Sequence, residues 1–320
     1  MQPDTILVTG ATGFAGSHLL DRLADRAPVV AWFRPDGHEP DPDRHIDWRP
    51  VDLLDPVAVA EGVLEAAPSW VYHVAGAPQV DTSWHTVVPH LRTNVLGTHH
   101  VLEAVKIAAR PCRVLVVSSA QIYQATDDPI DEDAPLVPPS PYGLSKLAQD
   151  RLAARAAVED GLDVVIARPF NHAGPRQNKA FAVSSFARQI ARIEAGLAPP
   201  EIHVGNLDAR RDVTDVRDVV EAYDCLMADA PPARPYNICS GRAWRIGDLL
   251  DELRHLATTP VTVIVDQARL RPNDVPVLQG DATRIRAELG WTPKIPVEQM
   301  LSDTLDWWRA EIRQGRDTSS

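Results

Sequence analysis

The sequence is poor in lysine and in long apolar runs, and each shortage excludes a class of protein. Its 32 basic residues include only four lysines, and 44 acidic residues outnumber them, which gives a net charge of −12. This balance argues against nucleic acids and anionic membranes as partners, so an anionic ligand would need a local cluster of arginines. No window approaches the ~18 apolar residues of a membrane span, so we expect no membrane partner.

Cysteine is also scarce. Cys112, Cys225 and Cys239 show no C-x-x-C spacing and are expected to be reduced packing thiols of a cytoplasmic protein. The start, Met1 to Asp4, has no basic region, and the apolar run that follows is too short for a signal peptide. No group of His, Cys and Asp residues has metal-ligand spacing, so we expect no metal site.

Strand-like and helix-like patterns alternate in the first half of the chain. Apolar runs at 29–33, 70–75 and 113–118 alternate with helical periodicity at 13–26, 56–67, 90–109 and 142–159. This predicts an α/β fold, a Rossmann-type doubly wound parallel sheet, with a smaller C-terminal α/β substrate domain. We expect residues 1–170, with about 206–240, to form the dinucleotide-binding domain. Residues 171–205 and 241–313 would form the smaller second domain, and 314–320 a frayed tail.

A glycine-rich turn follows the first apolar run. Glycines 10, 13 and 16 lie between Ile6-Leu7-Val8 and a helical pattern. Strand, glycine turn and helix start together favour a pyrophosphate cradle, with Gly10, Thr12, Gly13, Phe14 and Ala15 beside the cofactor. The spacing G-x-x-G-x-x-G departs from the common G-x-G-x-x-G, and an ordinary tight turn is the alternative.

Two positions bear on the choice of cofactor. Arg34 ends the second strand where a carboxylate would favour NAD, so the sequence favours NADP(H), with NAD(H) as the alternative. A solvated loop arginine is the other interpretation of Arg34. Asp52 follows a third candidate strand and could accept a hydrogen bond from the adenine amino group or act as a turn or cap residue.

Tyr142 and Lys146 carry the sharpest chemical signal. Four residues apart, they share one face of a predicted helix. A nearby ammonium lowers the pKa of a phenol and makes it a usable general acid or base. Chance could also place such a pair on a helix surface. Its position, beyond the strand that ends at Ser118-Ser119, favours the interpretation as an active site.

These motifs resemble the extended short-chain dehydrogenases/reductases that modify nucleotide sugars. The resemblance rests on Thr9 to Gly16, Asp52, Asn94 to Thr98, Ser118-Ser119 and Tyr142-x-x-x-Lys146. The second half is similar to the GDP-mannose branch, which contains 4,6-dehydratases and 4-keto-6-deoxy-mannose reductases. The segments that carry this similarity are 168–175, 205–218, 236–241 and 271–276.

The resemblance implies a role for each matching position. Ser119, Tyr142 and Lys146 would be catalytic, and Arg211 and Arg271 would clamp a diphosphate. Further cofactor contacts would be Leu53, Val74, Ala75, Gly76 and Asn94. Further substrate contacts would be Gln121, Asn171 and Asp274, with Val183 contacting the base through backbone atoms. The implied partner is a nucleotide-diphosphate sugar, with a GDP-sugar favoured, and the helical segments 84–109 and 142–159 would pair in a homodimer.

The residues after Ser119 separate the possible reactions. Dehydration needs a base and an acid near C5 and C6 of the sugar, but Ala120 and Gln121 cannot exchange protons near neutral pH. Unless Asp131 or Glu132 takes that role, we expect a reductase that converts GDP-4-keto-6-deoxy-D-mannose to a GDP-6-deoxy-mannose (rhamnose) type product. The alternatives are a nucleotide-sugar 4-epimerase with retained NAD, a 4,6-dehydratase, and a non-catalytic binding protein.

Overall fold

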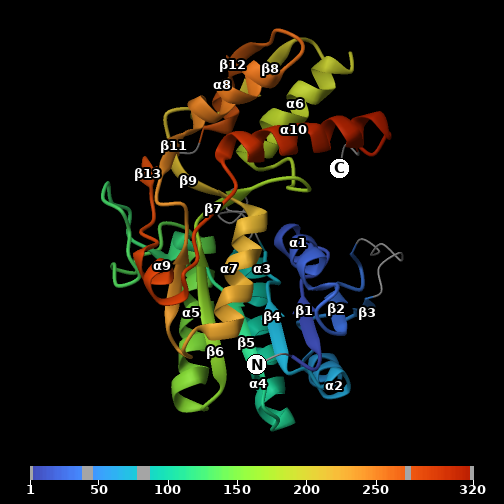
Figure 1. The fold of residues 1–320 in the computed structure, drawn as a ribbon, viewed down its shortest axis with the longest axis vertical. Helices are drawn as coiled ribbons and strands as arrows, with labels where there is room; N and C mark the ends of the chain where they lie inside the picture. Colours follow the sequence, from blue (N-terminus) through green and yellow to red (C-terminus); the bar gives the residue numbers. More distant parts are fainter. Residues whose placement is uncertain (1–2, 38–45, 78–86, 271–274, 318–320) are drawn as a thin grey trace.

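A parallel sheet forms the larger part of the molecule (Figure 1). The structure is a computed structural model that describes residues 3–37, 46–77, 87–270 and 275–317. The strand order is β10-β6-β5-β4-β1-β2-β3, and every neighbouring pair is parallel. The bounds are β1 Ile6–Thr9, β2 Val29–Phe33, β3 Asp47–Pro50, β4 Trp70–His73, β5 Arg113–Val117, β6 Asp163–Pro169 and β10 Pro235–Ile238.

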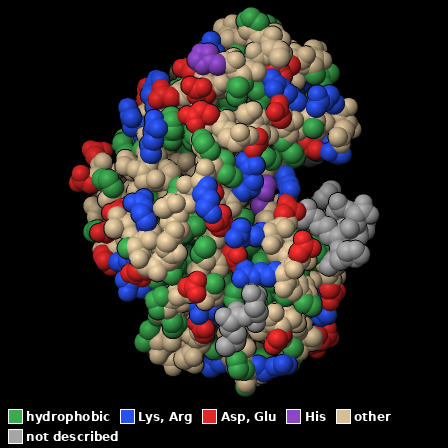
Figure 2. Space-filling view, in the orientation of Figure 1, with side chains coloured by type: hydrophobic (Ala, Val, Ile, Leu, Met, Phe, Trp, Pro, Cys, Tyr) green, Lys and Arg blue, Asp and Glu red, His purple; other side chains and the backbone are tan. Residues whose placement is uncertain are grey.

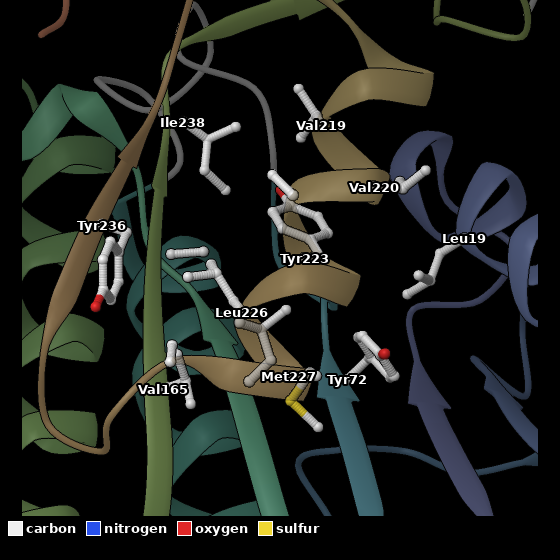
Figure 3. Packing of buried hydrophobic residues seen from close by; sticks show 14 of the residues in the cluster. Leu19, Tyr72, Val165, Val219, Val220, Tyr223, Leu226, Met227, Tyr236 and Ile238 are labelled. Carbon is white, nitrogen blue, oxygen red and sulfur yellow. The ribbon is translucent and has the colours of Figure 1, made fainter. Parts of the chain in front are cut away.

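Helices cover both faces of this sheet, as its near-continuous apolar strands require. On one face lie α1 (Phe14–Leu23) and α7 (Val216–Asp229), which pack against each other. Figure 3 shows Tyr223, Leu226 and Met227 of α7 beside Tyr72 and Val165 of the strands. On the other face lie α2 (Pro56–Ala66), α4 (Gly97–Ala108) and α5 (Pro141–Glu159). The predicted Rossmann-type fold is therefore confirmed.

The strand order reverses beside β1. The chain passes from β1 to β2 and β3 on one side and then crosses to β4 on the other side. In an open parallel sheet, ligands bind in the crevice at the carboxyl ends of the strands beside such a switch point. Thr9 and His73, which end β1 and β4, are register partners there. The fold thus directs attention to the segments that follow these two strands.

The smaller part lies above the carboxyl ends of the strands in Figure 1. It contains a sheet of β7 (Asn171–Ala173), β9 (Arg210–Asp215), β11 (Ala243–Arg245) and β13 (Val277–Leu278), and a pair β8 (Glu201–Val204) with β12 (Thr262–Val265). The helices α6 (Ala182–Glu194), α8 (Ile246–Leu256) and α10 (Val297–Arg313) share a separate apolar cluster with these strands. The remaining elements are α3 (Val87–Leu91), η1 (Arg92–Leu96), η2 (Ala120–Ile122), η3 (Gln267–Arg269) and α9 (Thr283–Leu289).

We propose the two-domain division with changes at its boundaries. Strand β9 belongs to the small sheet, whereas α7 and β10 belong with the large one, so the return to the first domain begins at 216 rather than 206. The segment 278–291 packs its buried side chains into the core of the large sheet. In the tail, Asp317 forms ion pairs with Arg188 and Arg192 of α6, so the chain is held as far as this residue. None of the described helices is long and apolar enough to cross a membrane.

Candidate active site at the carboxyl ends of the strands

The glycine turn lies between β1 and α1, as the sequence predicts. Gly10 has φ +68°, a left-handed conformation that glycine adopts without strain. A Cβ at Gly10 would come within 2.6 Å of Ala75 Cα, so the turn packs directly against the segment that follows β4. The first-turn N–H groups of Phe14 and Ala15 have no intrahelical partner by the geometry of a helix start.

This turn fits a pyrophosphate. Thr12 and Gly13 are exposed at the helix start, where the dipole favours negative charge. The predicted contacts Val74, Ala75 and Gly76 follow β4, and Ala75 borders this turn while Gly76 borders Asn94 and Lys146. The predicted cradle, Gly10 to Ala15, is thus in one place and has the open backbone that a dinucleotide phosphate needs.

Arg34 follows β2 and is exposed. Its Nε lies 2.8 Å from Oδ1 of Asp36, and the side chains are 74% and 80% exposed. An ion pair this exposed contributes little to stability, so Arg34 can exchange Asp36 for another anion. The sequence analysis did not consider Asp36, which is the one carboxylate paired with Arg34 among the described residues.

Asp52 is a turn residue in this structure. Its Oδ1 accepts a hydrogen bond from Leu54 N at 2.9 Å, and its carbonyl accepts one from Asp55 N. The side chain of Leu53 packs near Gly97, and its carbonyl accepts a bond from His100. Both predicted residues therefore fix the loop after β3, while the exposed carboxylate of Asp52 still faces outward.

Asn94 is fully buried in η1, a π-helical turn. Its Oδ1 accepts a bond from Ala77 N at 2.8 Å, and its Nδ2 donates to Ser145 Oγ at 2.9 Å. The side chain therefore ties the segment after β4 to α5. Such π-turns often occur at functional sites. Both ends of the Asn94 amide have protein partners. Its predicted direct contact with the cofactor stays a prediction.

Ser119 follows β5 and begins the short helix η2. Its Oγ accepts a bond from Gln121 N at 3.1 Å, and its side chain lies near enough to Tyr142 to act on the pKa of the phenol. The backbone of Gln121 packs against Gly143 in the first turn of α5. Ser119 and Tyr142, 23 positions apart in the sequence, thus lie together as the predicted site requires.

Tyr142 occupies the first turn of α5 because the sequence starts this helix just before it. Ser140 Oγ caps the helix by accepting a bond from Gly143 N, and Pro141 stands at the first helical position. Tyr142 is 9% exposed and Lys146, one turn later, is 5% exposed. The predicted shared face is therefore directed into the protein rather than to solvent.

The predicted lowering of the pKa of Tyr142 by Lys146 is wrong for the site as it stands. Burial raises the pKa of Tyr142 to about 12, and the hydrogen bond to Ser119 only partly opposes this effect. Burial lowers the pKa of Lys146 to about 7. Lys146 Nζ donates instead to Val117 O at 2.9 Å and to Gln149 Oε1 at 2.8 Å. Desolvation thus outweighs the attraction on which the sequence argument relied.

The predicted substrate residues are less closely gathered. Asn171 is exposed at the start of β7, and Arg211 lies on the adjacent strand β9. Val183 is a buried core residue of α6, so only its backbone could contact a ligand. Arg271 and Asp274 lie outside the described residues. Figure 2 shows the surface indented on its right side between the two parts, with basic side chains along the indentation.

Two contacts bear on the substrate side. Asp212, which follows Arg211 on β9, is fully buried and accepts bonds from the backbone of Ser240 and Gly241. It therefore shapes the loop after β10. The ring of His172 on β7 stacks on Phe14 at 5.7 Å, which joins the smaller part to the start of α1.

Sequence reasoning missed a network of buried polar side chains beside the Pro-rich segment 124–141. Arg168 binds both oxygens of Asp150, at 2.8 and 3.0 Å, and also donates to Tyr123 Oη. Glu132 accepts a bond from Asn237 N at 2.8 Å and lies 3.4 Å from Arg284 Nε. The only available signal was Arg168 in an apolar strand. A charged side chain is seldom buried without a partner, so this arginine needed a carboxylate.

A further missed residue is His90 on α3. It is 3% exposed, and its ring meets the ring of Tyr142 edge-on at 6.0 Å. Burial lowers its pKa, so it is expected to be neutral near pH 7. Among the described residues, no group of His, Cys, Asp and Glu could hold a metal ion.

The parallel sheet, the glycine turn and the Ser119–Tyr142–Lys146 arrangement define an extended short-chain dehydrogenase/reductase, an oxidoreductase-type enzyme. A sequence profile for the family described as "GDP-mannose 4,6 dehydratase" matches residues 7–304, and the chain belongs to this family.

The chain is 33% identical to the GDP-6-deoxy-D-mannose reductase of Pseudomonas aeruginosa over 312 residues, which cover 97% of this chain and 98% of the relative. It is 25% identical to the GDP-mannose 4,6-dehydratase of Vibrio cholerae, with 95% and 93% covered.

The chain also resembles solved structures over nearly its whole length. The structure of RMD from Pseudomonas aeruginosa complexed with NADPH has a TM-score of 0.84 and 32% identity, over 96% of this chain and 99% of that one. The UDP-glucose 4-epimerase of Thermus thermophilus in complex with NAD has a TM-score of 0.85 and 27% identity, over 95% and 99%. One fold thus serves reductases, dehydratases and epimerases, so the reaction must be argued from the site.

Proposed function

We propose that this protein is an NADPH-dependent reductase of GDP-4-keto-6-deoxy-D-mannose that forms a GDP-6-deoxy-mannose (rhamnose) type product. The observation that carries the proposal is that buried Ser119 and Tyr142 lie together beside a non-acidic segment, Ala120-Gln121. The 33% identity to a GDP-6-deoxy-D-mannose reductase supports the same reaction.

The fate of Glu132 argues further against dehydration. One oxygen of Glu132 accepts the N–H of Asn237, and the other faces Arg284. The loop around it is fixed by backbone bonds between Ile130 and the segment at Gln279 to Asp281. Glu132 is therefore a structural carboxylate, and a move to the sugar would leave the Asn237 N–H without this acceptor, while Arg284 would keep its ion pair with Asp133. Asp131 is occupied in part as well, since its Oδ1 accepts a bond from Asp133 N.

Each catalytic side chain has one task in reduction. A nicotinamide bound at this site would supply the hydride for the 4-keto carbon. Tyr142 Oη donates its proton to the carbonyl oxygen as negative charge develops there, so the C=O group becomes a CH–OH group. Ser119 donates a hydrogen bond to the same oxygen. A pKa of about 12 keeps Tyr142 protonated at neutral pH, which suits a group whose task is to donate.

NADP(H) is the cofactor that the residues favour, with NAD(H) as the alternative. Arg34 provides a guanidinium at the end of β2, where a 2′-phosphate would lie. Asp36 beside it could bind ribose hydroxyls, which leaves room for NAD(H). A relative solved with NADPH supports the first choice.

The decisive experiment measures cofactor consumption and product together. The protein as purified is mixed with NADPH and GDP-4-keto-6-deoxy-D-mannose, and the products are identified by mass spectrometry and NMR. The proposal expects one NADPH oxidised for each sugar reduced. An epimerase would change the sugar without net cofactor consumption, and a dehydratase would instead release water from GDP-mannose. Either result would replace the proposed reaction.

We also propose a homodimer through α4 and α5. Large apolar side chains are exposed on the outer face of η1–α4 (Leu96, Ile107) and of α5 (Leu144, Val158). The two helices pack against each other, and the proposed interface takes its apolar residues from both. Sedimentation should show a dimer that Leu144→Arg converts to a monomer. A wild-type monomer would refute this interface.

The cytoplasmic location also remains a proposal. It is supported by the state of the three cysteines, all of which are free thiols. Cell fractionation would test it.

A further inference from the structure

Lys146 donates a hydrogen bond to an acceptor that has no part in the proposed reduction. Its Nζ donates to Gln149 Oε1 at 2.8 Å as well as to Val117 O at 2.9 Å. Gln149 lies one turn later on α5 and is fully buried. A buried amide must find partners for both its oxygen and its nitrogen, so its bonds reveal what it holds in place.

The hydrogen positions around Gln149 can be assigned without ambiguity. Gln149 Nε2 donates to Thr98 Oγ1 at 2.8 Å, because the hydroxyl proton of Thr98 is used elsewhere, and the Gln149 oxygen therefore faces Lys146. The one proton of Thr98 goes to Asn94 O at 2.7 Å, because a carbonyl can only accept. Thr98 Oγ1 must therefore accept from both of its other neighbours, Gln149 and His73 Nε2, the latter at 2.9 Å.

The same logic extends to the glycine turn. Burial, assisted by the charge of Lys146, lowers the pKa of His73 to about 3, so its imidazole is neutral. With the proton on Nε2, His73 Nδ1 must accept from Thr9 Oγ1 at 2.8 Å. Thr9 ends β1 immediately before Gly10. A continuous chain of hydrogen bonds thus joins the phosphate turn to Lys146.

We propose that Gln149 is a positioning residue for Lys146. Together with Val117 O, it occupies two of the three hydrogen-bonding directions of the lysine nitrogen and leaves the third for the crevice. A Cβ at Gly76 would lie 3.3 Å from Lys146 Nζ and 3.0 Å from Asn94 Oδ1, so the nitrogen borders open backbone there. The inference deepens the proposed reductase function and rests on it for its catalytic meaning.

The surroundings make Gln149 important for the charge of Lys146. The groups that face the lysine are neutral His73 from β4, Asn94 from η1 and Tyr142 from its own helix. The nearby carboxylate of Asp150 is held by Arg168 on the other side. No described carboxylate is hydrogen-bonded to Lys146, so the carbonyl oxygens of Gln149 and Val117 are what support an ammonium at this site.

The test titrates Lys146 directly by NMR of lysines labelled at the ε-carbon. The chain has only four lysines, and Lys146→Met identifies the signal of the buried one. We expect a midpoint near 7 in the wild type. Gln149→Glu should raise it by at least about one pH unit, because a carboxylate favours the ammonium. Gln149→Met should lower it, because an acceptor is lost while burial stays.

Unchanged midpoints in both variants would overturn the proposal. The control is Gln189→Met in α6, whose amide binds the backbone of His203 and should leave Lys146 unmoved. If Gln149→Met fails to fold, Gln149→Glu alone decides, since a purely structural glutamine predicts no upward shift. The titration needs neither substrate nor cofactor, so its outcome is independent of the proposed reaction. Where reduction is observed, the alkaline limb of kcat should move in the same direction as the midpoint.

Discussion

The larger and the smaller part of the molecule hold their site residues in different ways. Beside the large sheet, Asn94 and Lys146 are fixed by buried hydrogen bonds to strand ends and neighbouring helices. In the smaller part, Asn171 extends from a short strand and is exposed, while Arg211 binds the backbone of its own strand. Groups that must meet a reacting carbon gain from rigid placement, whereas groups that select a sugar nucleotide can vary on a shared scaffold. The following predictions probe this difference.

The largest expected effect separates catalysis from substrate binding. Tyr142→Phe removes the proton donor and should lower kcat by roughly 10²–10⁴-fold while NADPH still binds. Asn171→Ala in the smaller part should act mainly on KM for the sugar. Steady-state kinetics with a separate measurement of NADPH affinity would distinguish them. Tyr236→Phe is the control, because the Tyr236 hydroxyl binds Glu288. Full turnover by Tyr142→Phe would refute the catalytic assignment.

Two glycines with the same backbone conformation provide a matched test of packing. Gly10 has φ +68° and Gly196 has φ +70°, but a Cβ would clash with Ala75 only at Gly10. Gly196→Ala should cost about 1–2 kcal/mol of unfolding free energy from left-handed strain alone. Gly10→Ala should cost more than this and should abolish dinucleotide binding. Denaturant unfolding and NADPH titration measure both effects. Equal losses in the two variants would show that the phosphate turn is no more constrained than a helix end in the smaller part.

Arg34 tests the same comparison, because it follows a strand of the large sheet but is exposed, unlike the buried Asn94 and Lys146. Arg34→Ala should weaken NADPH binding by about 10–100-fold, the worth of a charge-assisted hydrogen bond. It should leave NADH affinity and thermal stability nearly unchanged. Equilibrium titration with both cofactors measures the preference. Asp36→Asn, the control, should not weaken NADPH binding. If Arg34→Ala weakens both cofactors equally, the arginine does not read the 2′-phosphate.

The parts of the site that the sequence predicted are those with a local signal. The glycine turn and the Tyr142–Lys146 spacing each lie within a few consecutive residues. The chain Thr9–His73–Thr98–Gln149 comes from four elements that only the folded sheet brings together. No pattern in the sequence marks such a set, because each member alone could be an ordinary core residue.

Predictions about environment failed for a related reason. The effect of Lys146 on Tyr142 was argued from their distance along a helix, but the pKa values of both depend on burial. Position along the chain shows which groups can meet, while desolvation, which depends on the whole fold, decides what state they are in.

The smallest expected effect lies in the smaller part, far from the chemistry. Arg188 Nε donates to Asp317 at 2.6 Å, and Arg192 binds the other oxygen. Burial acts to raise the pKa of Asp317, but the two guanidinium groups hold it below its usual value. A lowered pKa in the folded state means stability that is present above the unfolded pKa of about 3.9 and lost as pH falls through the folded value.

Asp317→Asn should therefore lower the free energy of unfolding by about 1 kcal/mol at pH 7, and by progressively less as the pH falls below 4. Because the tie lies on α6, kcat should not change. Chemical denaturation at pH 7 and at a pH below 4 measures this difference in the free energy of unfolding. The control is Asp306→Asn, which removes the ion pair of Asp306 with Arg309. The Asp306 side chain is 63% exposed, so this change should have a smaller effect. A pH-independent loss in Asp317→Asn would show that packing, and not the ion pairs, holds this end of the chain.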